Sequence, residues 1–418
     1  MLVETIQTSK KLSLIVFIFT MTIVTLTIIP VLFPAYYASI FVNSDQFGAG
    51  EISALEPGIF FIPVVISIVL TFSVFVISKF KSIKIPRFDI SKRKSLIGLI
   101  IILVIFSVHA SQEVFEKDHH EDFVQIQKRL QQWPPDHVSF EPHVKYILLE
   151  TSMLIFGNYR IIPTIASALL LVIVYMFTNK ITNNKIGGLV SSGIILQSDI
   201  FLSYSTTPTY TIFWSLFYLS SVYIILHKTW ILSPALFVMS LLSKPVTVAF
   251  LPMSIFFILN TNISRRRKII LLSITAIMIF AGAAFISEGQ IKSSFWMEGF
   301  VKGFTAFTYQ MRFDLIIVVL LIPVSFGLYL ISKKNGMANN ISIFISGLLI
   351  LNPILLSTTA FSSQPYRWVP LIIFVAIGAG MMFAKYTESK INNEDVIEKV
   401  DKTPKNSKKR FSKKSKLR

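Results

Sequence analysis

Side chains that could carry out acid–base chemistry are most concentrated in one segment, residues 111–160. It holds four of the six histidines and eight of the 22 acidic residues. Its EKDHHED run places Asp118, His119, His120 and Asp122 within five positions. Carboxylates and imidazoles are the groups that most often take or give a proton in catalysis. The cluster is therefore a candidate site, and the alternative is that its members are the solvated polar residues of an external loop.

A metal ion is another interpretation of this cluster. The chain has no cysteine, which excludes thiolate ligands and disulfides. Two adjacent histidines on a helix point about 100° apart, and no HExxH spacing brings two imidazoles to one face, so zinc is not expected. Oxygen ligands suit Mg²⁺ or Mn²⁺ better, and Glu116 and Asp118 would supply them.

Two isolated cations stand next to apolar runs. Lys244 lies in SLLSKPVTVAFLP, between two hydrophobic stretches, and Arg367 lies in SSQPYRWVPL, where the last stretch begins. A cation at the edge of a membrane is costly, which suggests a function, and the alternative is that each side chain extends to the lipid phosphates. Together with the carboxylates of 111–160, these cations form the candidate site.

Membrane helices must position these residues. The chain has 418 residues, of which 53% are hydrophobic and only 15% charged, a composition that no ordinary soluble domain could bury in one core. Because a helix that spans a bilayer needs about 20 apolar residues, the sequence predicts an all-α, polytopic transmembrane bundle of about 12 spans. The predicted spans are 13–34, 57–78, 96–110, 161–178, 186–200, 208–226, 229–243, 245–260, 268–286, 314–332, 340–358 and 368–385.

Between the third and fourth spans, apolar residues recur at helical spacing. This stripe predicts an amphipathic juxtamembrane helix over 121–133 that lies on the outer membrane surface. Pro134 and Pro135 end it, because proline cannot continue a helix. The residues of the stripe are Phe123, Ile126, Leu130 and Trp133.

The basic residues lie mostly on one side of the predicted spans. With the N-terminus inside, 30 of the 40 Lys and Arg residues fall in cytoplasmic segments. The positive-inside rule then predicts that both termini are cytoplasmic, while 111–160 and Lys244 face outward from the cell (plasma) membrane. The basic tail, 386–418, is expected to be disordered beside anionic membrane lipids. Because Phe411 is the only aromatic residue from Lys402 onward, nucleic acid is not expected as a partner.

Four groups of residues follow one another in an order that resembles a known family. The order is similar to that of the GT-C superfamily of membrane glycosyltransferases, in the branch of protein O-mannosyltransferases and aminoarabinose transferases, over residues 96–385. The first group is Asp118, Glu121 and Asp122; the second is Pro142, Tyr146, Leu148, Phe156, Gly157, Arg160, Pro163 and Ala168; the third is Leu241, Leu242 and Lys244; the fourth is Arg367, Trp368 and Pro370.

The chain departs from this family pattern at two places. Asp118 is followed by His119, where the family has an Asp-Glu pair. The sequence SYSTTPT around Ser205 replaces an Arg/Asp pattern. The first departure concerns the base of the reaction and the second concerns the substrate.

The resemblance implies an integral membrane glycosyltransferase. It would transfer a sugar from a polyprenyl-phosphate donor to a lipid, glycan or protein acceptor on the extracytoplasmic face, in one displacement that inverts the anomeric carbon. Asp118, or Asp122 as second choice, would be the base, and no cofactor would be required, with Mg²⁺ or Mn²⁺ as the alternative. The substrate-binding residues would be His119 and His120 for the acceptor, Lys244 and Arg367 for the phosphate, and Arg160.

A transporter or a non-catalytic membrane scaffold is the alternative function. A transporter should place ionisable residues in the middle of its spans and show an internal repeat, and the sequence shows neither. The predicted organisation has three parts: an extra N-terminal transmembrane hairpin with a basic inner loop (1–95), the glycosyltransferase-like membrane domain (96–385) with its outer loop, and the tail (386–418).

Overall fold

The protein is a helical bundle in every part that the structure describes. The computed structural model describes residues 10–35, 57–79, 90–116, 118, 122–131, 143–288, 297–358 and 365–384. Every regular element within these ranges is a helix, which confirms the all-α fold class. The chain divides into two units, Met1–Lys385 and Tyr386–Arg418, and the described residues belong to the first. The predicted basic tail, 386–418, lies outside them.

Within the described ranges, five helices are long and apolar enough to cross a membrane. They are α1 (Lys10–Leu32), α4 (Lys92–Glu113), α7 (Ile161–Thr182), α15 (Leu315–Ser332), and the continuous run of η5 (Pro365–Trp368) and α17 (Val369–Met382). These helices indicate a membrane protein by length and composition.

The described residues do not confirm a count of twelve spans, because most of the other predicted stretches form shorter helices. At about 1.5 Å per residue, the 11 residues of α8 reach little more than half of a hydrocarbon core that is about 30 Å thick. Lys244 has extended backbone, with φ −158° and ψ 116°, and separates two such pieces. The shorter apolar pieces are Phe61–Ile77 within α3 (Phe61–Lys79), α8 (Lys185–Ile195), α10 (Phe213–Ile225), η2 (Trp230–Leu232) with α11 (Ser233–Ser243), η3 (Pro245–Phe250) with α12 (Leu251–Asn260), and Met337–Leu351 within α16 (Met337–Thr358).

The remaining helices include one that the sequence analysis did not predict, α14 (Met297–Tyr309), which packs against α1 and α16. It is amphipathic rather than uniformly apolar, so a search for apolar runs passes over it. Phe307 of α14 stacks on Trp368, with ring centroids 4.2 Å apart. The others are α5 (Asp122–Gln131), α6 (His143–Phe156), α9 (Asp199–Tyr204), α13 (Arg265–Glu288) and η4 (Gln310–Phe313).

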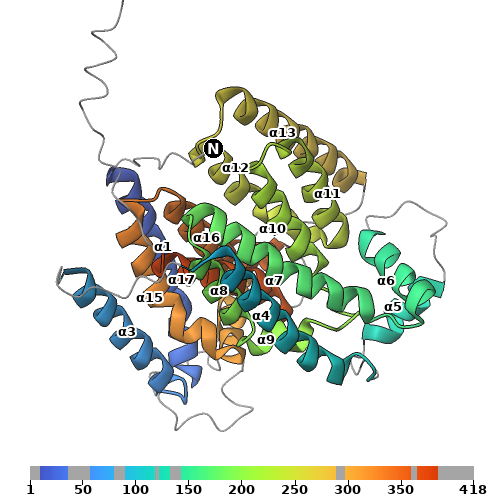
Figure 1. The fold of residues 1–418 in the computed structure, drawn as a ribbon, viewed down its shortest axis with the longest axis horizontal. Coiled ribbons are helices and arrows are strands. Elements are labelled where there is room, and N and C mark those ends of the chain that lie inside the picture. Colours follow the sequence, from blue (N-terminus) through green and yellow to red (C-terminus); the bar gives the residue numbers. More distant parts are fainter. Residues whose placement is uncertain are drawn as a thin grey trace, which may run out of the picture. The chain divides into compact units, whose positions relative to one another are not determined.

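Helix α17 forms the centre of the bundle (Figure 1). All of its residues from Val369 to Met381 are buried, which is what a helix that is apolar on every side requires. Its neighbour α8 approaches closely through two glycines. A Cβ atom on Gly380 would lie 2.3 Å from the carbonyl oxygen of Gly187, so only small residues permit this contact.

The predicted amphipathic helix is confirmed as α5, within two residues at each end. Ile126 and Leu130 are buried, as the stripe predicts, and Phe123 packs edge-on against Tyr159. Trp133, Pro134 and Pro135 lie outside the described residues. The position of α5 on an outer membrane surface stays a prediction.

Candidate functional site

The threonines of residues 205–210 hold the first predicted carboxylate. This segment follows α9, and Thr206, Thr207 and Thr209 are all buried. The hydroxyl groups of Thr207 and Thr209 both donate to Oδ2 of Asp118, at 2.9 and 2.8 Å. Two donors on one oxygen fix the orientation of the carboxylate.

The same segment also holds the second predicted carboxylate. Asp122 is the first residue of α5, where the helix dipole favours an acidic side chain. The hydroxyl group of Tyr210 donates to Oδ2 of Asp122 at 2.6 Å. Burial, followed by this hydrogen bond, raises the pKa of Tyr210 above its ordinary value, so the phenol keeps its proton and remains a donor. The SYSTTPT sequence, which departs from the family pattern, therefore orients Asp118, and Tyr210, the residue that follows it, orients Asp122.

Lys145 is a site residue that the sequence analysis missed. It is half-buried in the first turn of α6, and its Nζ donates to the carbonyl oxygen of Thr209 at 2.6 Å. Burial and the nearby charge of Lys244 lower its pKa to about 7, although Asp118 acts in the opposite direction. Like Lys244, Lys145 is a cation beside an apolar stretch of the sequence. This feature could have identified Lys145 as a candidate site residue.

Lys244 lies between α11 and η3 and contacts a tyrosine. Its Nζ donates to the hydroxyl oxygen of Tyr366 and lies 4.1 Å from the centroid of that ring. Burial lowers the pKa of Lys244 to about 7, and the charge of Arg367 adds to this effect. Arg367 is itself buried and shares a side-chain hydrogen bond with Tyr366. Tyr366 therefore brings the two predicted cations together.

Stacked tyrosines connect the cations to the carboxylates. The rings of Tyr210 and Tyr366 are stacked, with centroids 4.7 Å apart and planes at 16°. Tyr204 meets both rings edge-on, with centroid distances of 5.8 Å. Because Tyr210 binds Asp122 and Tyr366 binds Lys244, the stack joins the two halves of the candidate site.

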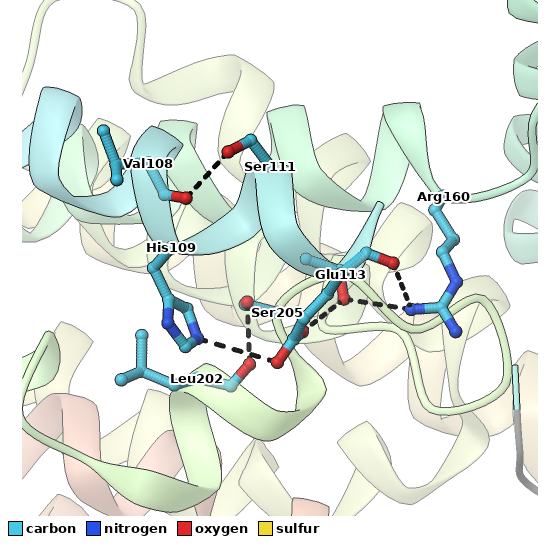
Figure 2. Close-up of polar contacts among 8 residues, drawn as sticks. Val108, His109, Ser111, Glu113, Arg160, Leu202 and Ser205 are labelled. Atoms are coloured by element: carbon cyan, nitrogen blue, oxygen red, sulfur yellow. Dashed lines mark hydrogen bonds and ion pairs between the residues drawn. The ribbon is translucent and has the colours of Figure 1, made fainter. Parts of the chain in front are cut away.

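A second polar cluster anchors the threonine segment to the end of α4 (Figure 2). The carboxylate of Glu113 accepts a hydrogen bond from Thr206 at 2.9 Å and lies 3.7 Å from Nε2 of His109. Figure 2 shows the guanidinium of Arg160 pointing toward Glu113. It donates to the carbonyl oxygen of Glu113 at 3.1 Å and to Thr206 at 3.4 Å. These contacts give Arg160 a positioning role, and its predicted binding of substrate stays a prediction.

The remaining predicted site residues concern the acceptor and the metal. His119 and His120 lie outside the described residues. Glu116 is exposed, while Oδ2 of Asp118 is occupied by two threonine hydroxyls. In the described ranges, no group of three His, Cys, Asp or Glu side chains could hold a metal ion. Binding of Mg²⁺ or Mn²⁺ by Glu116 and Asp118 stays a prediction, because one or two carboxylates can bind Mg²⁺ together with water and phosphate oxygens.

Comparison with known proteins identifies no similar protein. No protein-family model, curated protein or solved structure matches the chain. The chemistry of the candidate site therefore rests on its own geometry. The site combines a carboxylate fixed by hydrogen bonds, lysines with depressed pKa values, and a tyrosine stack between them.

Proposed function

We propose that this protein is an integral membrane glycosyltransferase that uses a polyprenyl-phosphate-linked sugar and modifies a lipid, glycan or protein on the extracytoplasmic face. The observation that carries the proposal is one juxtaposition. Asp118, fixed by two threonine hydroxyls, lies in the same site as Lys145, whose pKa responds to the charges of both Asp118 and Lys244. Glycosyl transfer from a phosphate needs these two elements, a base and cations.

Asp118 serves as the general base in this proposal. It takes the proton of the acceptor hydroxyl as the hydroxyl oxygen attacks the anomeric carbon. The bond between that carbon and the phosphate oxygen breaks at the same time, so a single displacement inverts the configuration. The hydroxyl groups of Thr207 and Thr209 orient the carboxylate without taking its charge. Asp122 is the second candidate.

The cations stabilise the departing phosphate. Lys145, Lys244 and Arg367 supply donors that a phosphate group can accept, and charge-assisted hydrogen bonds of this kind are about twice as strong as neutral ones. Positive charge placed where negative charge develops stabilises the transition state strongly in many transfer reactions. Mg²⁺ or Mn²⁺ is therefore not required in this mechanism.

The proposed orientation places the site outside the cell (plasma) membrane and both termini in the cytoplasm. In support, 30 of the 40 basic residues lie on the side that the positive-inside rule assigns to the cytoplasm. The shorter apolar helices, in pairs or singly, would complete about 12 spans. Single cysteines can replace His120 and Arg266 in this cysteine-free chain and be labelled with an impermeant reagent in intact cells. Protection of position 120 together with labelling of position 266 would overturn the orientation.

The direct test offers both kinds of donor to the purified, reconstituted full chain. Radiolabelled polyprenyl-phosphate sugars and nucleotide sugars are supplied with membrane extracts as acceptors, and mass spectrometry of glycans in a deletion strain identifies the missing product. We expect transfer from the lipid-linked donor alone. Lys185→Met is a matched control, because Lys185 also donates to a backbone carbonyl, that of Ile90, away from the candidate site. Turnover with nucleotide sugars alone would contradict the proposal.

A further inference from the structure

Among the described residues, the two lysines of the candidate site donate hydrogen bonds to uncharged partners. Nζ of Lys145 donates to a backbone carbonyl, and Nζ of Lys244 donates to a phenol. In the described part of the chain, neither ammonium group lies within ion-pair distance of a carboxylate; the ion pair found there is that of His109 and Glu113. Each lysine can donate three hydrogen bonds, so both keep capacity for a ligand.

The surroundings of these lysines disfavour positive charge. Lys145 occupies the first turn of a helix, where the dipole disfavours a cation. The other charges that act on it are Lys244 and Arg129, which lower its pKa, and Asp118 and Asp122, which raise it. Lys244 is influenced by Arg367. Like charges gathered away from water are tolerated when something compensates them.

The charge of the compensating ligand follows from the chemistry of a prenyl phosphate. A sugar linked through one phosphate to a lipid is a phosphodiester with one negative charge. The lipid phosphate that leaves is a monoester, which carries close to two negative charges near pH 7 because its second pKa is about 6. Two lysines that donate to a carbonyl and a phenol match the second of these anions better than the first.

We infer that Lys145 and Lys244 form a binding site for a doubly charged prenyl phosphate and bind it more tightly than a singly charged prenyl phosphodiester. This inference rests on the proposed function in taking a lipid phosphate as the ligand. The preference assists the reaction, because charge on the phosphate grows as the sugar leaves, and an interaction that strengthens along this path lowers the barrier. The same preference makes the lipid product an inhibitor.

Binding of three short soluble probes tests the inference. Citronellyl phosphate, citronellyl diphosphate and methyl citronellyl phosphate are titrated calorimetrically into the detergent-purified full chain at pH 7. The monoester and the diphosphate carry at least two charges, and the methyl diester carries one. We expect the monoester to bind at least tenfold more tightly than the diester. A diphosphate that binds tenfold more tightly than the monoester would instead identify a diphosphate-linked lipid as the source of the anion.

Matched variants assign the preference to the lysines. In Lys145→Met and Lys244→Met, the ratio of monoester to diester affinity should fall to less than threefold, while Lys185→Met keeps the ratio of the unchanged chain. If a variant does not fold, the ratio measured for the unchanged chain still decides. Equal affinity for monoester and diester in the unchanged chain overturns the inference.

The inference and the proposed function fail in different ways. A monoester preference that depends on the lysines, in a protein that transfers no sugar, would leave the anion site standing and remove the glycosyltransferase. Sugar transfer without any monoester preference would do the reverse.

Discussion

Polar side chains gather at both ends of helix α7, and the two gatherings differ in kind. At the start of the helix lies the candidate site, which is charged. At its end lies an amide cluster, which is neutral and is formed by asparagines from the end of α12 and the start of α16. The members of the amide cluster are Asn260, Asn335, Asn339 and Asn340.

The amide cluster satisfies its own hydrogen bonds. Nδ2 of Asn335 donates to the carbonyl oxygen of Ile181 at 2.9 Å, and its Oδ1 accepts from the backbone of Met337 at 3.0 Å. Asn260 donates to Asn340 at 2.8 Å. Donors and acceptors are matched without charge, as buried polar groups in a membrane bundle require.

The candidate site does not balance its cations in this way. Its lysines meet a carbonyl and a phenol, and burial depresses their pKa values. The comparison therefore separates polar groups that hold the helices together from polar groups that we propose bind a ligand. Substitutions in the candidate site should therefore lower activity, and substitutions in the amide cluster should lower stability.

The largest expected effect belongs to Asp118→Asn. The amide keeps the shape of the carboxylate and can still accept hydrogen bonds from Thr207 and Thr209, but it does not take a proton. Turnover in a reconstituted transfer assay should fall by about 10²–10⁴-fold, while binding of the donor survives. Both quantities are measured on the same preparation.

Asp122→Asn, measured in parallel, decides between the two carboxylates. Its partner Tyr210 keeps an oxygen acceptor, so a loss of turnover in this variant alone would assign the base to Asp122. Full activity of both variants would remove the carboxylates from the mechanism and return these residues to the solvated loop that the sequence also allowed. A change within about 0.5 kcal/mol of stability is expected of such a loop.

The next effect belongs to Lys244→Ala. It removes the Nζ that contacts Tyr366, and with it a charge that acts on the phosphate before and during the reaction. Donor affinity and turnover should both fall, by about 10- to 100-fold in affinity, because charge-assisted hydrogen bonds contribute about 1.5–3 kcal/mol. Unchanged donor affinity would show that Lys244 only extends toward lipid headgroups.

The pH dependence of phosphate binding should give a smaller effect. The pKa values of Lys145 and Lys244 are about 7, and a bound anion would raise them because it favours the charged form. Binding therefore takes up protons above pH 7 and weakens as the pH rises, by about tenfold between pH 7 and 8.5 for one lysine. Calorimetry in buffers of different ionisation enthalpy measures the uptake. Affinity that stays constant over this range would contradict the depressed pKa values.

Much of the fold could be predicted from the sequence, because apolar runs and helical spacing are local signals. The helices α1, α4, α7, α15 and α17 all fall on predicted stretches. Helix α14 could not be found in this way, because it is amphipathic rather than uniformly apolar. Its apolar face is explained by the helices that it packs against. The apolar stretch around Lys244 is interrupted because the backbone of this residue is extended, and not because of its amino-acid composition.

The candidate site could be predicted only in part. Charged residues such as Asp118 and Lys244 stand out from an apolar background, whereas Thr207 and Thr209 do not. Their contacts also join distant positions: 91 residues separate Thr209 from Asp118, and 122 residues separate Lys244 from Tyr366. Tertiary packing creates such neighbours, and no spacing rule in the sequence predicts them.

The smallest expected effect on function belongs to Asn335→Ala, in the amide cluster. The change leaves the carbonyl of Ile181 and the backbone N–H of Met337 without their partner, which should lower stability by about 1–3 kcal/mol. Thermal unfolding in detergent measures this loss. Because Asn335 lies near the end of α7 remote from Arg160, transfer at temperatures below the transition should stay within about twofold. A loss of turnover comparable to that of Lys244→Ala, in a variant that remains folded, would couple the two ends of α7 and break the separation of structural from ligand-binding polar groups.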